Sequence, residues 1–269
     1  MNEKLKDLNL IKKVILEGYK DPLPFISFDN DNSRGIFPFF KYENALTAII
    51  IPGGGFDFVS ILNEGIFIAK EFNKKGINAI VLSYGIKEKA KYPLPIFDLV
   101  EAYKFLEKYG PILNVDCKNY IVLGSSAGAF LTLSFSRKDI GYHFYKIKDA
   151  PKALILSYPL VSLKDNLTHK GSRDNVIGFL KKDIEKENLY SNEDYIDNDF
   201  PPCFIWCFNN DELVNSLNSR ILKEKLDEKE IKNELIIYEG NFHGVGLGRY
   251  TPSFGWFNLA LDFIKKNVK

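Results

Sequence analysis

The stretch GSSAG, residues 124–128, decides how this chain folds. An apolar run at residues 120–123 precedes it, and a second apolar run at residues 127–135 follows it. The first run suits a buried strand, and the second suits a helix. The five residues therefore predict a sharp turn from strand to helix, in which small neighbours let the two elements approach each other.

Ser126 stands at the centre of this turn and has a chemical use there. A G-x-S-x-G turn holds its middle residue in a strained backbone conformation and lifts the hydroxyl clear of the sheet. The next amide, that of Ala127, lies at a helix N-terminus and can donate to a developing anion. We therefore expect Ser126 to be a nucleophile. A phosphate-cradling loop is disfavoured because the Gly-Lys-Ser/Thr ending is missing, and a plain small-residue turn is the other alternative.

Further apolar runs alternate with helical stripes along the chain. Such runs suit strands buried on both faces of a parallel sheet, and the stripes suit helices that cover it. The sequence therefore predicts a doubly wound α/β sheet. The expected core strands are 46–51, 78–84, 120–123, 153–157, 203–208 and 234–238, with edge strands at 25–28 and 37–42. The expected helix stripes are Leu62-Ile66-Ala69-Phe72, Ile96-Leu99-Val100-Tyr103-Leu106, Leu213-Leu217-Ile221 and Trp256-Leu259-Ala260-Phe263.

One segment, residues 161–200, breaks this rhythm because it is polar and rich in Asn, Asp and Lys. Its apolar residues Ile177, Phe179, Leu180 and Tyr190 favour an ordered cap over disorder. We expect residues 1–269 to form a single domain that carries this cap as an insertion.

A glycine-rich loop, PGGGF at residues 52–56, follows the first core strand. Three glycines let backbone amides face a ligand at close range. We expect the amides of Gly54, Gly55 and Ala127 to form an oxyanion hole beside Ser126. The alternatives are a flexible turn or a dinucleotide loop, but the latter needs G-x-G-x-x-G.

The chain has three histidines, and His243 lies between the last core strand and the last helix. It is the expected general base for Ser126, whereas His143 and His169 are interpreted as structural. Asp211 ends the strand at 203–208 and is the expected acid partner of His243. Its alternative role is an N-cap, and Glu212 is the rival carboxylate.

Composition excludes several classes of protein. Lys and Arg number 36 against 35 Asp and Glu, so no basic face for nucleic acid is indicated. No apolar run reaches the ~20 residues of a membrane helix, and the first residues, MNEKLK, are unlike a signal peptide. Three cysteines cannot all pair within one chain, which fits a reducing, cytoplasmic location. Cys203 and Cys207 lie on one apolar run and indicate core thiols rather than metal ligands.

The sequence resembles the small bacterial acetyl esterases and acetylxylan-esterase-like proteins, often labelled xylanase-related, which are related to hormone-sensitive lipase. The resemblance covers roughly residues 45–265. Its motifs, in the family's order, are PGGGF at 52–56, NEG at 63–65, Tyr92-Pro93 with Asp98, GSSAG at 124–128, Tyr158-Pro159, THKGS at 168–172 and FHGVGL at 242–247.

The resemblance implies an α/β-hydrolase fold and a serine carboxylesterase for short acyl esters, commonly acetyl groups on sugars. It implies a triad of Ser126, Asp211 and His243, with Gly54, Gly55 and Ala127 as oxyanion donors, no metal and no organic cofactor. The stretch at 83–86 lacks the Asp-Tyr-Arg of the wider family, so the natural ester is left open, as are self-association and the role of residues 168–172. Two alternatives stand: a serine peptidase of the same fold and a catalytically silent binding protein.

Overall fold

A computed structural model describes residues 25–178 and 183–268 of the chain. The MNEKLK stretch, Phe179 and Leu180, used in the expectations above, lie outside the described residues. Within them, strands form one eight-stranded sheet in the order β1-β2-β4-β3-β5-β6-β7-β8. The strands are β1 (Ile26–Ser27), β2 (Gly35–Phe39), β3 (Thr47–Ile51), β4 (Asn78–Ser83), β5 (Tyr120–Ser125), β6 (Leu154–Ser157), β7 (Cys203–Phe208) and β8 (Asn233–Tyr238).

The strands from β4 to β8 pair in parallel, while β1 and β2 add an antiparallel edge beside β4. The central strands β3, β5, β6 and β7 are buried along their whole length. Their continuous apolar runs are what a sheet covered on both faces requires. The predicted core strands are confirmed. The predicted antiparallel edge is also confirmed, but β2 covers 35–39 instead of the expected 37–42, because its pairing with β4 begins at Gly35 and ends at Phe39.

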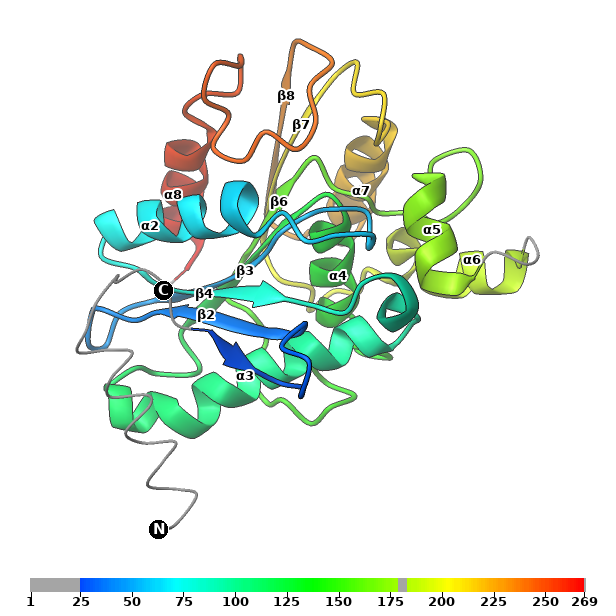
Figure 1. The fold of residues 1–269 in the computed structure, drawn as a ribbon. Coiled ribbons are helices and arrows are strands. Elements are labelled where there is room, and N and C mark those ends of the chain that lie inside the picture. Colours follow the sequence, from blue (N-terminus) through cyan, green and yellow to red (C-terminus); the bar gives the residue numbers. More distant parts are fainter. Residues whose placement is uncertain (1–24, 179–182, 269) are drawn as a thin grey trace.

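Helices cover both faces of this sheet (Figure 1). Residues of α2 and α8 pack in one hydrophobic cluster, and residues of α3, α4 and α7 pack in the other. The helices are η1 (Ile61–Ile66), α2 (Phe67–Lys74), η2 (Lys87–Ala90), α3 (Leu94–Leu113), α4 (Ala127–Ser136), α5 (Lys170–Ile177), α6 (Ile184–Tyr190), η3 (Asn192–Tyr195), α7 (Leu217–Glu228) and α8 (Trp256–Asn267).

Two of the predicted helix stripes are partly wrong, and one is mostly wrong. The α3 stripe is buried throughout, but Leu62 of the first stripe is 58% exposed and Leu259 of the last is 43% exposed. In the third stripe, Leu213 precedes α7 and is 57% exposed, and Leu217 is 46% exposed. The buried face of α7 instead carries Asn218, Ser219, Leu222 and Leu226. The predicted apolar stripe is wrong on α7 because a polar residue, Asn218, is buried on its inner face. The Asn218 side chain accepts from the amides of Val161 and Ser162, where the cap begins.

The described part of the insertion at 161–200 is ordered and contains α5, α6 and η3 (Figure 1). It is fastened to α4, the helix that follows Ser126. Asn192 accepts from Ser134 Oγ at 3.0 Å and donates to the carbonyl of Phe130. Buried Arg137 donates to the carbonyl of Leu189 and stacks on Tyr195. The expectation of an ordered cap fits this arrangement, and the division of residues 1–269 into one domain stays a prediction.

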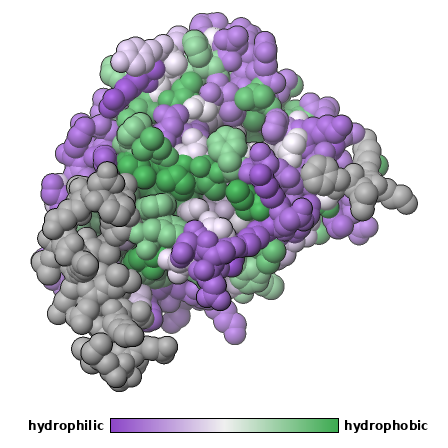
Figure 2. Space-filling view, in the orientation of Figure 1, coloured by the Kyte–Doolittle hydropathy of each residue, from purple (hydrophilic) through white to green (hydrophobic). Residues whose placement is uncertain are grey.

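Surface polarity is uneven on the face that Figure 1 presents. Hydrophobic residues gather near the middle of this face and hydrophilic residues lie around them (Figure 2). Exposed apolar side chains in the described residues include Phe58 and Leu62, between β3 and α2, and Phe67, the first residue of α2. None of the described helices is both long and apolar enough to span a bilayer.

Candidate active site

Ser126 occupies the turn between β5 and α4, as the sequence predicts. Its backbone has φ 53° and ψ −118°, which is a rare conformation for a residue with a side chain. The flanking glycines explain why the turn is possible. A Cβ on Gly128 would collide with the carbonyl oxygens of Ile51 and Pro52, and one on Gly124 would collide with Thr132. These two glycines let α4 lie directly against the sheet, which leaves Ser126 at its rim.

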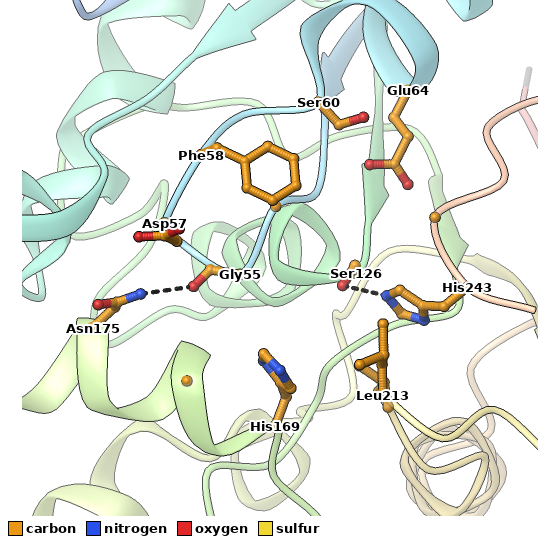
Figure 3. A pocket seen from close by; sticks show the side chains of 14 residues that line it. Gly55, Asp57, Phe58, Ser60, Glu64, Ser126, His169, Asn175, Leu213 and His243 are labelled. Carbon is orange, nitrogen blue, oxygen red and sulfur yellow. Dashed lines mark hydrogen bonds between the residues drawn. The ribbon is translucent and has the colours of Figure 1, made fainter.

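Three side chains from distant parts of the chain, Ser126, His243 and Asp211, meet at this rim. Figure 3 shows the contact between the first two. His243 Nε2 lies 2.8 Å from Ser126 Oγ, and His243 Nδ1 lies 2.6 Å from Asp211 Oδ2. A carboxylate only accepts, so Nδ1 carries the proton, and Nε2 is left to accept from the serine hydroxyl. Asp211 follows β7 and His243 follows β8, so parallel strands bring both to the carboxyl edge where β5 ends.

Asp211 also accepts from backbone amides of the turn that follows it, and it uses its other carboxylate oxygen to do so. Oδ1 accepts from the amides of Leu213 and Val214 at 2.9 and 3.0 Å, while Oδ2 faces His243. Asp211 is not the N-cap of α7, because that position is Ser216. The rival carboxylate, Glu212, is exposed. The local turn thus fixes the Asp211 carboxylate in the orientation that His243 needs.

The glycine loop after β3 lies against Ser126. A Cβ on Gly53 would come within 3.0 Å of the Ser126 Cβ, and Gly54 and Gly55 both have positive φ. Within the described residues, no intramolecular acceptor is recorded for the amides of Gly54, Gly55 or Ala127. Such unsatisfied amides are the donors that an oxyanion requires. The loop is held from the cap side, because Asn175 donates to the Gly55 carbonyl at 3.1 Å.

A buried pair behind the site was not anticipated as functional. Glu64 is 2% exposed; its Oε2 accepts from the Gly53 amide and its Oε1 from the Tyr158 hydroxyl. Burial raises the pKa of Glu64, and burial next to Glu64 raises that of Tyr158 well above its ordinary value. The NEG and Tyr-Pro motifs contained both residues, but neither periodicity nor spacing indicated that they would meet.

Ser126, His243 and the glycine loop line a cavity of about 610 Å³ (Figure 3). The cap contributes His169, which the sequence interpretation had placed outside the site as structural. His143, by contrast, is exposed and does not line the cavity. The signal that could have found His169 is the THKGS motif within a polar insertion. The lining consists of Gly54, Gly55, Asp57, Phe58, Ser60, Glu64, Ser126, His169, Gly171, Asn175, Leu213, Val214, His243 and Gly244.

The two cysteines of the apolar run at 203–208 lie where the sequence predicts. Cys203 and Cys207 are free and buried in β7, as core thiols should be. Among the described residues, no group of three or more His, Cys, Asp or Glu is arranged to hold a metal ion.

The sequence pattern of the BD-FAE family matches residues 38–226, which is well over half of the chain. The chain belongs to the BD-FAE family. The match spans β3, the glycine loop, the Ser126 turn and Asp211, and it ends before His243. The family assignment confirms the resemblance to esterase-related α/β-hydrolases.

Two relatives of the chain are named as a xylanase and an acetylxylan esterase. The chain is 32% identical over 216 residues to endo-1,4-beta-xylanase B of Butyrivibrio fibrisolvens, covering 77% of this chain and 34% of that protein. It is 26% identical over 256 residues to an acetylxylan esterase of Xylanibacter ruminicola, covering 93% and 52%. The chain therefore spans between about a third and a half of the length of these two relatives.

Solved structures show that this BD-FAE member has the α/β-hydrolase fold. The acetyl ester-xyloside bifunctional hydrolase of Caldicellulosiruptor lactoaceticus superimposes with a TM-score of 0.80 at 23% identity, covering 93% of this chain and 98% of that one. A carboxylesterase of Lactobacillus plantarum WCFS1 gives a TM-score of 0.77 at 19% identity, covering 90% and 96%. At these identities the likeness concerns the fold alone.

Proposed function

We propose that this BD-FAE member is a serine carboxylesterase that hydrolyses short acyl esters through an acyl-enzyme. The observation that carries the proposal is the continuous chain of contacts from Ser126 Oγ to His243 Nε2, at 2.8 Å, and from His243 Nδ1 to Asp211, at 2.6 Å. A serine hydroxyl needs a neutral imidazole to take its proton, and the carboxylate holds the imidazole in the required tautomer.

In the first half-reaction, Ser126 Oγ attacks the ester carbonyl carbon while its proton passes to His243 Nε2. The carbonyl oxygen becomes an oxyanion and accepts from the amides of Gly54, Gly55 and Ala127. A single such donor contributes about 3–4 kcal/mol to lowering the barrier. The intermediate then collapses: the bond to the alcohol oxygen breaks, His243 gives its proton to that oxygen, and the acyl group stays on Ser126.

In the second half-reaction, water replaces the alcohol. His243 takes a proton from the water as its oxygen attacks the acyl carbon, and the same amides receive the oxyanion. Collapse of this intermediate breaks the bond to Ser126 Oγ, returns the proton from His243 to the serine and releases the acid. Asp211 stays ionised throughout and stabilises the imidazolium that forms twice in each cycle.

The names of the relatives support acetyl esters as substrates, and an acetylated sugar is the alcohol portion that these names suggest. The peptidase alternative is weaker because two of the relatives carry the names of an acetylxylan esterase and an acetyl esterase. A silent binding protein would not need the contacts that join Ser126, His243 and Asp211. A cytoplasmic location and self-association stay predictions.

Labelling with a fluorophosphonate tests the proposal directly, because this probe reacts only with an activated serine. We expect one adduct, on Ser126, together with turnover of p-nitrophenyl acetate. Ser126→Ala should lose both and keep the thermal unfolding curve of the parent. A protein that takes no label and turns over no ester would instead be a silent binding protein.

A further inference from the structure

His169 brings a second imidazole into the cavity of the proposed active site. It is the N-cap residue of α5, in the cap, and it lines the same cavity as Ser126 and His243 (Figure 3). Its ring lies beside the glycine loop: a Cβ on Gly55 would stand 3.6 Å from the His169 Cε1 atom. His169 therefore lies beside Gly55, one of the proposed oxyanion donors, and among the described residues no hydrogen bond joins it to Ser126 or His243.

The capping contact fixes which ring nitrogen of His169 carries the proton. The backbone amide of Ser172 donates to His169 Nδ1 at 3.3 Å, and Ser172 Oγ lies 2.8 Å from the same nitrogen. A backbone N–H group can only donate, so Nδ1 must be an acceptor and the neutral ring carries its proton on Nε2. Across the described residues, no hydrogen-bond partner is recorded for Nε2.

The surroundings keep this ring neutral. Burial, with a further contribution from nearby His243, lowers the pKa of His169 below its ordinary value of 6.5. A neutral imidazole with Nδ1 already engaged offers the cavity one group only, the Nε2–H donor. A donor of this kind selects ligands that bring an oxygen acceptor to it.

The size of the cavity indicates which part of an ester reaches this donor. A volume of about 610 Å³ lies within the ~300–1,000 Å³ typical of sites for whole small-molecule ligands. An acetyl group is only a few atoms and would occupy a small fraction of it. The rest of the cavity is left for the alcohol portion, and Asp57 and Asn175 add polar groups to its wall.

We propose that His169 is a specificity residue that donates its Nε2–H group to an oxygen in the alcohol portion of the ester. The inference rests on the proposed esterase function. It predicts a preference for esters of polyhydroxylated or polyacylated alcohols, which present oxygens near the scissile bond, over esters of apolar or aromatic alcohols.

The test compares the parent with His169→Asn on three esters. Asparagine is among the best N-cap residues, so α5 keeps its cap while the Nε2–H donor is lost. Xylose tetraacetate and p-nitrophenyl acetate share an acyl group and differ in the alcohol. The ratio of their kcat/KM values should fall about tenfold in His169→Asn, as expected for one lost hydrogen bond. The ratio for p-nitrophenyl butyrate against p-nitrophenyl acetate, which differ only in the acyl group, should not move.

Controls keep this outcome separate from a folding defect. His143→Asn changes an exposed histidine outside the cavity and should leave all three rates unchanged. His169→Asp is a second capping variant without the donor, and thermal unfolding of each variant checks the fold. An unchanged sugar-to-aryl ratio, or a change that follows the acyl chain, would overturn the assignment of His169. A parent protein that cleaves none of the esters and takes no fluorophosphonate would overturn the proposed function itself.

Discussion

The ring of Tyr158 lies 4.7 Å from the ring of His243. Its hydroxyl donates to Glu64 at 2.5 Å and accepts from the amide of Gly246 at 3.2 Å. Glu64 in turn accepts from Gly53 at the start of the glycine loop. Through Glu64, Tyr158 therefore links the loop that carries His243 to the glycine loop, beside a second link from the Asn63 side chain to the Gly244 carbonyl.

Tyr158→Phe tests this connection. The change leaves one Glu64 oxygen and the Gly246 amide without their partner inside the protein, and a buried polar group left in this way costs about 1–3 kcal/mol. We expect the free energy of unfolding to fall by about 2 kcal/mol and kcat to fall more than KM changes. Urea unfolding and steady-state kinetics measure the two effects. Tyr250→Phe, at a fully exposed position, is the control, and equal behaviour of the two variants would contradict the connection.

Asp211→Asn separates the two uses of this side chain. The amide oxygen of asparagine can still accept from Leu213 and Val214, so the turn should persist. The other half of the amide cannot accept from His243 Nδ1, and the imidazole then adopts the wrong tautomer. We expect kcat on p-nitrophenyl acetate to fall by about 10⁴. Glu212→Gln is the matched control and should act like the parent; the reverse result would move the acid to Glu212.

Gly128→Ala tests the close packing of α4 on the sheet. The new methyl group would meet the carbonyl oxygens of Ile51 and Pro52, both backbone atoms that cannot rotate away. Overpacking of this kind costs about 1–3 kcal/mol and displaces the helix, so stability and labelling of Ser126 should fall together. Gly76→Asn is the comparison, because Gly76 has open space around it and a positive φ that Asn tolerates. Equal stability of the two variants would contradict the packing argument.

Asp98 predicts a pH dependence of stability. It accepts from the Gly85 amide and from Arg34, yet burial raises its pKa from 3.8 to about 6. The folded chain therefore holds this proton where the unfolded chain releases it, and the stability that the protonated form contributes is lost as pH rises from about 4 to 6. Denaturant titrations across this range should show the parent losing stability relative to Asp98→Asn. A relative gain would mean that the Arg34 ion pair outweighs burial.

Features with a local cause could be predicted from the sequence. A strand that is buried on both faces appears in the sequence as a continuous apolar run. The bounds of β3, β5, β6 and β7 were therefore predicted to within one or two residues. The Ser126 turn was equally local, because its glycines and its flanking runs stand together in residues 120–135. The meeting of Asp211 and His243 followed from topology, since parallel strands end at one edge.

Features that depend on tertiary contacts could not be predicted in this way. Leu213 suits a helix stripe by spacing, yet it lines the cavity. It lies before α7, in the turn where its amide donates to Asp211. Glu64 stood in the NEG motif without an assigned role, because its contacts with Tyr158 and Gly53 come from distant parts of the chain. His169 was set aside because its one signal, the THKGS motif, does not show which of the motif's side chains turns into the cavity.

The hydrogen bond from Asn175 to the Gly55 carbonyl has an evolutionary consequence. Asn175 and His169 belong to the same short segment, so a substitution that shifts this segment moves both the Gly55 backbone, a proposed oxyanion donor, and the cavity wall that carries His169. Acquiring a new substrate by remodelling the cap would then alter turnover as well as preference. Homologues that differ in this segment should therefore show paired substitutions in the glycine loop.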